Sequence, residues 1–114
     1  MAKEKVSIII PTYNRAHIIK KALDSVLAQT YPWFEVIIVD DGSTDNTREV
    51  IEAYEDERIR YYYTELNQGA SAARNYGLKK AQYNFIAFED SDDIWYNEKL
   101  EKQMKVLCNA ALDV

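Results

Sequence analysis

Short apolar runs alternate with longer amphipathic stretches along this chain. β-Branched and aromatic residues concentrate in the short runs, which is typical of strands. The first two runs are continuous enough to predict strands buried on both faces. We expect four strands, at residues 6–10, 34–39, 58–64 and 83–88.

The stretches between these runs have helical periodicity. In the first stretch, apolar side chains recur at i, i+4, i+7 and i+8 from Ile19. Asn46 followed by Glu49 fits a capping box at the start of the second helix. We expect helices at residues 16–29, 70–81 and 96–112, and a further helix after Asn46 whose apolar face lies within residues 50–54. The expected buried side of the 96–112 helix is Leu100, Met104 and Leu107, with Ile94 just before it.

A strand followed by a helix, four times over, predicts an α/β fold. Strands separated by helices pair in parallel through right-handed crossovers, which gives a three-layer sandwich with a mostly parallel central sheet. The 114 residues are enough for one domain, and we find no internal repeat and no linker. The sequence therefore predicts a single domain over residues 1–114.

Composition narrows the classes of protein that remain. An apolar content of 47% predicts a folded chain, and no apolar run is long enough to span a bilayer. The N-terminus lacks the apolar core of a signal peptide, and a single cysteine, Cys108, excludes an intrachain disulfide. We therefore expect a cytoplasmic protein, at most associated with the inner face of the membrane. A net charge of −5 without a basic stripe argues against nucleic acid as a partner.

Polar segments follow each predicted strand. Ligands of open parallel sheets bind beyond the carboxyl ends of the strands, so these segments mark the candidate site. They are PTYNR after the first strand, DDGSTD after the second, NQG leading to Arg74 after the third, and EDSDD after the fourth. Polar and acidic groups are thus expected to collect along one edge of the sheet.

The last of these segments places four carboxyl groups close together. Asp90 and Asp92 are separated by one residue, so both can reach one cation, and hard oxygen ligands suit Mg²⁺ or Mn²⁺. A divalent cation offsets the repulsion between the carboxylates and can bridge them to a diphosphate. The alternative is a solvated acidic turn that caps the last helix. The position after an apolar strand of an α/β chain favours the cation.

The other segments carry weaker signals when each is taken alone. Asp40 and Asp41 end a strand before Gly42, and a carboxylate there can accept hydrogen bonds from a base or a ribose, or can simply cap a turn. Tyr13 can stack on a planar ring or pack at the sheet edge. Arg74 offers a planar cationic fork for phosphate, or is a surface arginine.

Together the four segments resemble the nucleotide-sugar-binding half of a family 2 glycosyltransferase. The motifs are VSIIIPTYNR, SVLAQTYPWFEVIIVDDGSTDNT, NQGASAARNYGL and FIAFEDSDD, in that order, and the resemblance covers roughly residues 6–112. It implies a GT-A fold, a nucleotide-sugar donor that is often a UDP-sugar, and Mn²⁺ or Mg²⁺ as cofactor.

The resemblance also implies roles for individual residues. Tyr13 contacts the nucleobase, and Asp41 accepts a hydrogen bond from it. Asp90, in the DXD motif, faces the ribose, and Asp92 coordinates the metal. Three further residues are expected to border the nucleotide: Pro11, Thr12 and Arg74. One departure is Glu89, where the family commonly has an apolar residue; its side chain either adds a charge to the site or points elsewhere.

The resemblance implies inverting, metal-dependent sugar transfer to an acceptor hydroxyl. Family members usually continue beyond this length, and their second half carries the acceptor site and the catalytic base. We therefore expect the base beyond the end of this chain, so either the chain is part of a longer protein or another chain completes the site. The acceptor, a carbohydrate or a lipid-linked sugar, stays unassigned, as do the oligomeric state and the product, with polysaccharide biosynthesis as the expected setting.

Three other functions compete with this one. A receiver domain needs an acidic pair after the first strand, where this chain has PTYNR. A dinucleotide dehydrogenase needs a G-x-G-x-x-G motif, which is absent from the sequence. A non-catalytic nucleotide-binding module would share every motif with the enzyme and is separated from it only by a turnover assay.

Overall fold

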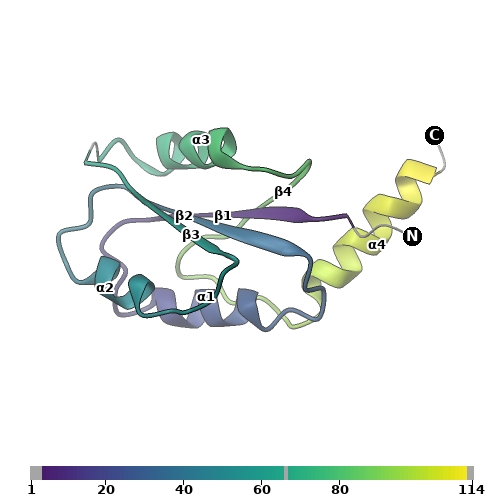
Figure 1. The fold of residues 1–114 in the computed structure, drawn as a ribbon, viewed down its shortest axis with the longest axis horizontal. Helices are drawn as coiled ribbons and strands as arrows, with labels where there is room; N and C mark the ends of the chain where they lie inside the picture. Colours follow the sequence, from purple (N-terminus) through teal and green to yellow (C-terminus); the bar gives the residue numbers. More distant parts are fainter. Residues whose placement is uncertain (1–3, 66, 113–114) are drawn as a thin grey trace.

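The computed structural model contains one parallel sheet with helices on both faces (Figure 1). It describes residues 4–65 and 67–112, with side chains as far as residue 107, so the side chain of Cys108 lies outside the description. The strands are β1 (Val6–Thr12), β2 (Phe34–Asp40), β3 (Ile59–Tyr63) and β4 (Phe85–Phe88). The helices are α1 (Ile19–Leu27), α2 (Thr47–Glu52), α3 (Ala70–Lys80) and α4 (Lys99–Leu112).

The sheet has the strand order β3-β2-β1-β4, with all three pairings parallel. β1 lies inside the sheet and pairs with both β2 and β4, so that Ile8 is level with Val36 on one side and Ala87 on the other. Every residue of β1 and β2 is buried. The predicted parallel α/β sheet and its doubly buried first two strands are confirmed.

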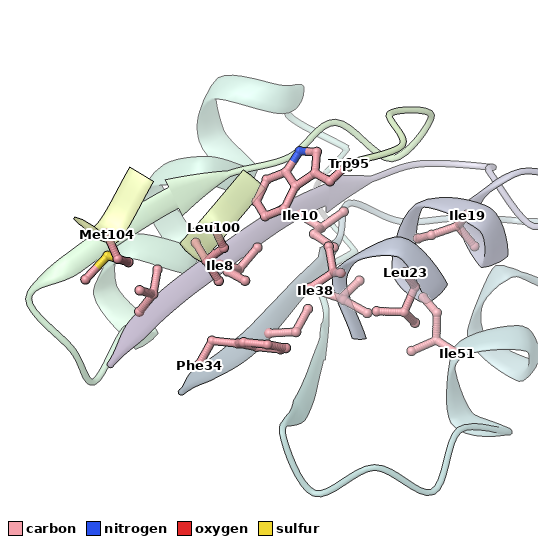
Figure 2. Packing of buried hydrophobic residues seen from close by; sticks show 13 residues of the cluster. Ile8, Ile10, Ile19, Leu23, Phe34, Ile38, Ile51, Trp95, Leu100 and Met104 are labelled. Carbon is pink, nitrogen blue, oxygen red and sulfur yellow. The ribbon is translucent and has the colours of Figure 1, made fainter. Parts of the chain in front are cut away.

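Two separate cores lie on the two faces of the sheet. Side chains alternate along a strand, so Ile8 and Ile10 point to the face covered by α1, α2 and the start of α4, whereas Ile9 points to the face under α3. Figure 2 shows the larger core, in which Trp95 and Leu100 pack over the strands. The smaller core comprises Ile9, Ile37, Val39 and Ala73.

β1 continues two residues beyond its predicted end. The sequence suggested that Pro11 closes the strand, yet Pro11 pairs with Val39 of β2 inside it. The carbonyl of Ile9 points toward β4 and accepts a hydrogen bond from Glu89 N–H. Backbone polar groups two residues apart in a strand point to the same side, so the nitrogen of Pro11 also points toward β4. At that level β4 has already ended, at Phe88. Because no ladder bond is available there, the missing N–H of Pro11 costs nothing.

Asn46 precedes α2 as the predicted N-cap, but the predicted capping bond is missing, and the predicted start of α4 is wrong. α2 has no capping bond from the Asn46 side chain; the carboxylate of Asp45 accepts the Thr47 N–H instead, at 3.0 Å. α4 begins at Lys99 rather than at residue 96. The carbonyls of Tyr96 and Asn97 accept hydrogen bonds from the end of the α1 segment, so this stretch cannot enter the helix earlier.

The buried side of α4 also differs from the prediction. Leu100 and Met104 are buried, as expected, but Ile94 and Leu107 are exposed. Figure 1 shows that α4 runs past the end of the sheet, which leaves its later turns without a strand to pack on, whereas Ile94 lies in the loop before the helix. Among the described residues, no helix is both long and apolar enough to cross a membrane.

Candidate functional site

A cavity of about 310 Å³ opens at the carboxyl ends of the strands. Segments that are far apart in the sequence form its walls: the end of β1, the first residue after β2, the start of α3, and the loop after β4. The lining residues are Pro11, Thr12, Tyr13, Arg15, Asp41, Asn67, Gly69, Ala70, Ala73, Asp90, Ser91 and Asp92. The predicted convergence of polar groups on this edge of the sheet is confirmed.

One wall of the cavity carries an unpaired hydroxyl group. Thr12 is buried at the end of β1, and its Oγ1 atom has no hydrogen-bond partner among the described residues. A buried polar atom without a partner costs about 1–3 kcal/mol, and this one lies in the wall of a cavity, where a ligand can supply the partner. The orphan hydroxyl therefore marks this part of the wall as a place for a ligand.

The carboxylate of Asp41 links two walls of the cavity. Its Oδ1 atom accepts a hydrogen bond from Gln68 N–H at 3.0 Å, and its Oδ2 atom accepts one from Gly69 N–H at 2.7 Å. These donors lie just before α3, so Asp41 fixes that helix start against β2. Each carboxylate oxygen has more than one acceptor site, so Asp41 can still accept a hydrogen bond from a ligand in the cavity.

Behind Asp41, a second carboxylate is held inside the protein. Asp40 is fully buried, and its side chain accepts hydrogen bonds from Ser43 N–H at 2.9 Å and from the Tyr61 hydroxyl. Burial and the hydrogen bond to Asp40 raise the pKa of Tyr61, so its hydroxyl remains a donor. Gly42, at φ +91°, lies in the turn between Asp40 and Ser43, a backbone conformation that glycine adopts without strain.

The four acidic side chains after β4 divide between different environments. Glu89 is buried and points away from the cavity, whereas Asp90 and Asp92 are exposed and line it. Asp90 also pairs with Arg74 of α3, with 3.2 Å between guanidinium and carboxylate. The open question about Glu89 is thereby answered, because its charge does not join the site.

The donor atoms at the cavity suit an open Mg²⁺ or Mn²⁺ site. Asp90 and Asp92 offer hard carboxylate oxygens on neighbouring parts of one loop. Within the part of the chain that the structure describes, no three His, Cys, Asp or Glu side chains come together as a closed metal cage. Such ions commonly take one or two carboxylates and complete their shell with water and substrate phosphates, so two aspartates fit the chemistry.

Six of the seven predicted site residues line this cavity, and the seventh, Arg74, reaches it through Asp90. Sequence reasoning assigned no role to Arg15 and Asn67, which also line it. Arg15 belongs to the PTYNR segment, and its permanent charge was a usable signal for a phosphate ligand. Asn67 belongs to the NQG segment, whose position after the third predicted strand was likewise a usable signal.

Comparison with known proteins places the chain among glycosyltransferases. The family model described as glycosyl transferase family 2 matches residues 7–114. TuaG of Bacillus subtilis (strain 168), named for teichuronic acid biosynthesis, is 50% identical over 107 residues, which are 92% of this chain and 42% of TuaG. WfgD of Escherichia coli, named a UDP-Glc:α-D-GlcNAc-diphosphoundecaprenol β-1,3-glucosyltransferase, is 48% identical over 102 residues, 90% of this chain and 40% of WfgD. The chain thus spans about two fifths of these relatives.

Two solved structures share the fold. S. aureus TarS (residues 1–349) in complex with UDP-GlcNAc has a TM-score of 0.87 and 37% identity, over 92% of this chain and 31% of that one. The mannosyltransferase PcManGT of Pyrobaculum calidifontis, in complex with GDP-Man and Mn²⁺, has a TM-score of 0.80 and 32% identity, over 88% and 31% of the two chains. The expected GT-A fold is confirmed by these neighbours.

Proposed function

The chain belongs to glycosyl transferase family 2, and from that premise we propose that it forms the donor-binding part of an enzyme that transfers a sugar from a UDP-sugar to an acceptor hydroxyl. The observation that carries the proposal is the convergence of Thr12, Asp41 and Asp92, from three separate segments, on one cavity. The complexes of TarS with UDP-GlcNAc and of PcManGT with GDP-Man support a nucleotide sugar as the ligand.

In this proposal the nucleoside binds at the part of the cavity formed by the end of β1 and by Asp41. Tyr13 is 39% exposed and offers a ring face on which a base can stack. Asp41 accepts a hydrogen bond from the base N–H, which adds to the two backbone donors it already holds. The hydroxyl of Thr12 and the backbone of Pro11 complete this wall, so the orphan Thr12 oxygen gains a partner when the ligand binds.

The part of the cavity formed by the loop after β4 receives the ribose and the diphosphate. Asp90 accepts a hydrogen bond from a ribose hydroxyl, and Arg74 borders the phosphates from its present pairing with Asp90. Asp92 holds Mn²⁺ or Mg²⁺, and when bound this ion supplies neutralisation of the departing diphosphate, a Lewis-acid role. The Mn²⁺ in the PcManGT complex supports a divalent cation in this fold.

The acceptor side of the reaction lies with residues outside this chain in the proposal. The three carboxylates in the cavity, Asp41, Asp90 and Asp92, all have donor or metal roles. We propose inverting transfer, in which a base supplied elsewhere deprotonates the acceptor hydroxyl for attack on the anomeric carbon. The name of WfgD supports a lipid-linked sugar as one class of acceptor, and the name of TuaG supports polysaccharide synthesis.

Calorimetry with UDP and Mn²⁺ tests the metal assignment. In the unaltered chain, Mn²⁺ is expected to tighten UDP binding, and Asp92→Asn is expected to abolish this dependence because it removes an anionic ligand while keeping the side-chain shape. Asp93→Asn is the matched control, since Asp93 is exposed in the same loop but does not line the cavity. Equal Mn²⁺ dependence in Asp92→Asn and in the unaltered chain would contradict the assignment.

A non-catalytic nucleotide-binding module is the second candidate. Each of the three carboxylates that line the cavity already has a role in binding the nucleotide or the metal, so no carboxylate of the cavity is left to act as a catalytic base. This favours the binding module for the chain taken alone. Both functions share the donor site and therefore the same UDP binding. Release of UDP from a UDP-sugar, measured after the chain is combined with a complete acceptor half, separates them, because a binding module stays inactive in that assay.

A further inference from the structure

Asn14 stands beside the cavity without lining it, while both of its neighbours, Tyr13 and Arg15, line it. Its backbone is in the left-handed region, at φ +52°. Asparagine tolerates this region better than most residues, since its short polar side chain can bond to nearby backbone. The residue therefore makes the turn that carries the chain from the end of β1 along the cavity wall.

The side chain of Asn14 is bound to the 43–47 loop, by which we mean the end of the connection between β2 and α2 together with Thr47, the first residue of α2. Its Oδ1 atom accepts hydrogen bonds from Thr44 N–H at 2.8 Å and from Asp45 N–H at 3.3 Å. One carboxamide oxygen thus satisfies two backbone donors of the neighbouring loop. The loop after β2 is in this way fixed to the loop after β1.

Hydrogen bonds in the opposite direction complete the attachment. The N–H of Asn14 donates to Ser43 Oγ at 2.8 Å, and the N–H of Arg15 donates to Thr47 Oγ1 at 3.1 Å. Ser43 and Thr47 are both buried, so these acceptors are held by the protein and not by solvent. Three consecutive donors are engaged, since Ala16 N–H also donates to Asp45 Oδ2 at 3.3 Å.

This arrangement fixes the backbone on both sides of Tyr13 and so the direction in which its side chain leaves the chain. Residue 12 is held to β2 by the bond from Asp41 N–H to Thr12 carbonyl at 2.9 Å, and residue 14 is held to the 43–47 loop. Tyr13 lies between these two fixed points, and its exposed ring makes no hydrogen bond to the part of the chain that the structure describes. We propose that Asn14 is a positioning residue of the donor site, which holds Tyr13 ready to stack on the base of a nucleoside diphosphate.

The inference rests on the proposed function and deepens it, and a double-mutant cycle tests it. Asn14→Gly keeps the left-handed backbone but removes the Oδ1 acceptor, so the fold is expected to survive. UDP affinity in the presence of Mn²⁺ is expected to fall about tenfold, which is the size of one net hydrogen-bond contribution. In a Tyr13→Ala background, Asn14→Gly is expected to change UDP affinity little, because its effect acts through the missing ring.

Three comparisons make the outcome unambiguous. Asn14→Asp retains an acceptor oxygen and is expected to restore most of the affinity, whereas Thr44→Ala keeps the Thr44 N–H and is expected to bind as the unaltered chain does. Pyrophosphate with Mn²⁺ has no base, so its affinity is expected to be the same in Asn14→Gly. Absence of UDP binding in the unaltered chain would contradict the proposed function. Normal UDP binding in Asn14→Gly, or an equal tenfold loss with and without the Tyr13 ring, would overturn the positioning role alone.

Discussion

Glu89 is the acidic residue after β4 that turns into the core. It is 1% exposed, and neither carboxyl oxygen has a hydrogen-bond partner among the described residues. The nearby Ser25 hydroxyl already donates to Ala22 carbonyl and accepts from Trp95 N–H. Burial raises the pKa of Glu89 to about 9, and the charges of Asp93 and Asp90 act in the same direction. Glu89 is therefore protonated at neutral pH.

Glu89 is expected to make the stability of the chain depend on pH. The pKa of Glu89 is about 9 in the folded chain and near its ordinary value of 4.5 in the unfolded chain. The folded chain therefore binds this proton more tightly, and the resulting stabilisation of the fold is fully present below pH 4.5 and is lost as pH rises toward 9. In that window the free energy of unfolding falls by up to about 1.4 kcal/mol per pH unit. Glu89→Gln keeps the shape without a titrating proton and is expected to remove this contribution. Urea denaturation at several pH values measures it, and equal slopes in both chains would refute it.

Asp41 combines a structural and a proposed binding role in one carboxylate. Asp41→Ala is expected to weaken UDP binding by about 1–3 kcal/mol, the range for leaving a hydrogen-bonding group unpaired. It also frees the N–H groups of Gln68 and Gly69, so the melting temperature is expected to fall. Pyrophosphate affinity separates the two effects, because a ligand without a base loses nothing from the missing base contact. Equal UDP affinity in both proteins would rule out base recognition by Asp41.

At the scale of elements, α3 lies unusually close to the sheet. A Cβ atom placed on Gly77 would lie 2.5 Å from Ile9 Cγ2, well inside van der Waals contact. Small residues on the inner side of α3, Ala73 and Gly77, permit this approach, and it brings the start of the helix to the cavity. The packing of α3 therefore places one wall of the cavity.

Gly77→Ala is expected to destabilise the fold by about 1–3 kcal/mol, since overpacking outweighs the better helix propensity of alanine. Asn75→Ala is the control, because Asn75 is exposed on the same helix and the change is expected to be neutral or slightly stabilising. Urea denaturation of the three chains gives the comparison. Unchanged stability of Gly77→Ala would mean that α3 can move away from the sheet without cost.

For the whole molecule, the donor site is expected to couple ligand binding to stability. A ligand that binds only the folded chain adds about 2.7 kcal/mol at 100 times its dissociation constant. For a domain of this size that corresponds to a rise in melting temperature of roughly 10 °C. UDP with Mn²⁺ is expected to produce such a rise and UDP with a chelator a smaller one. No shift at millimolar UDP and Mn²⁺ would count against the donor site.

The chain by itself is expected to bind UDP without transferring sugar. Loss of a general base alone costs about 10²–10⁴ in rate, and loss of acceptor positioning costs up to about 7–11 kcal/mol. A radiolabelled UDP-sugar with candidate acceptors measures this directly. Efficient transfer by the purified 114-residue chain would show that its own residues complete the reaction.

The local pattern of the sequence determined the elements and the edge where the site lies. Runs of β-branched residues and helical spacing depend on neighbours a few positions away, and parallel strands bring their carboxyl ends to one edge whatever the details. For this reason the sequence alone predicts that Thr12, Asp41 and Asp92 lie together, and all three line one cavity in the structure.

Tertiary contacts alone decided which polar groups face the ligand and where the elements begin. The direction of Glu89 depends on the core beneath β4, and the start of α4 depends on donors from residues 29 and 30, about 70 positions away. Likewise, the link between Asn14 and the 43–47 loop joins two segments that have no common sequence pattern. A hydrogen bond between distant segments forms only once the chain has folded, because the energy of each partner is set by the burial that folding creates.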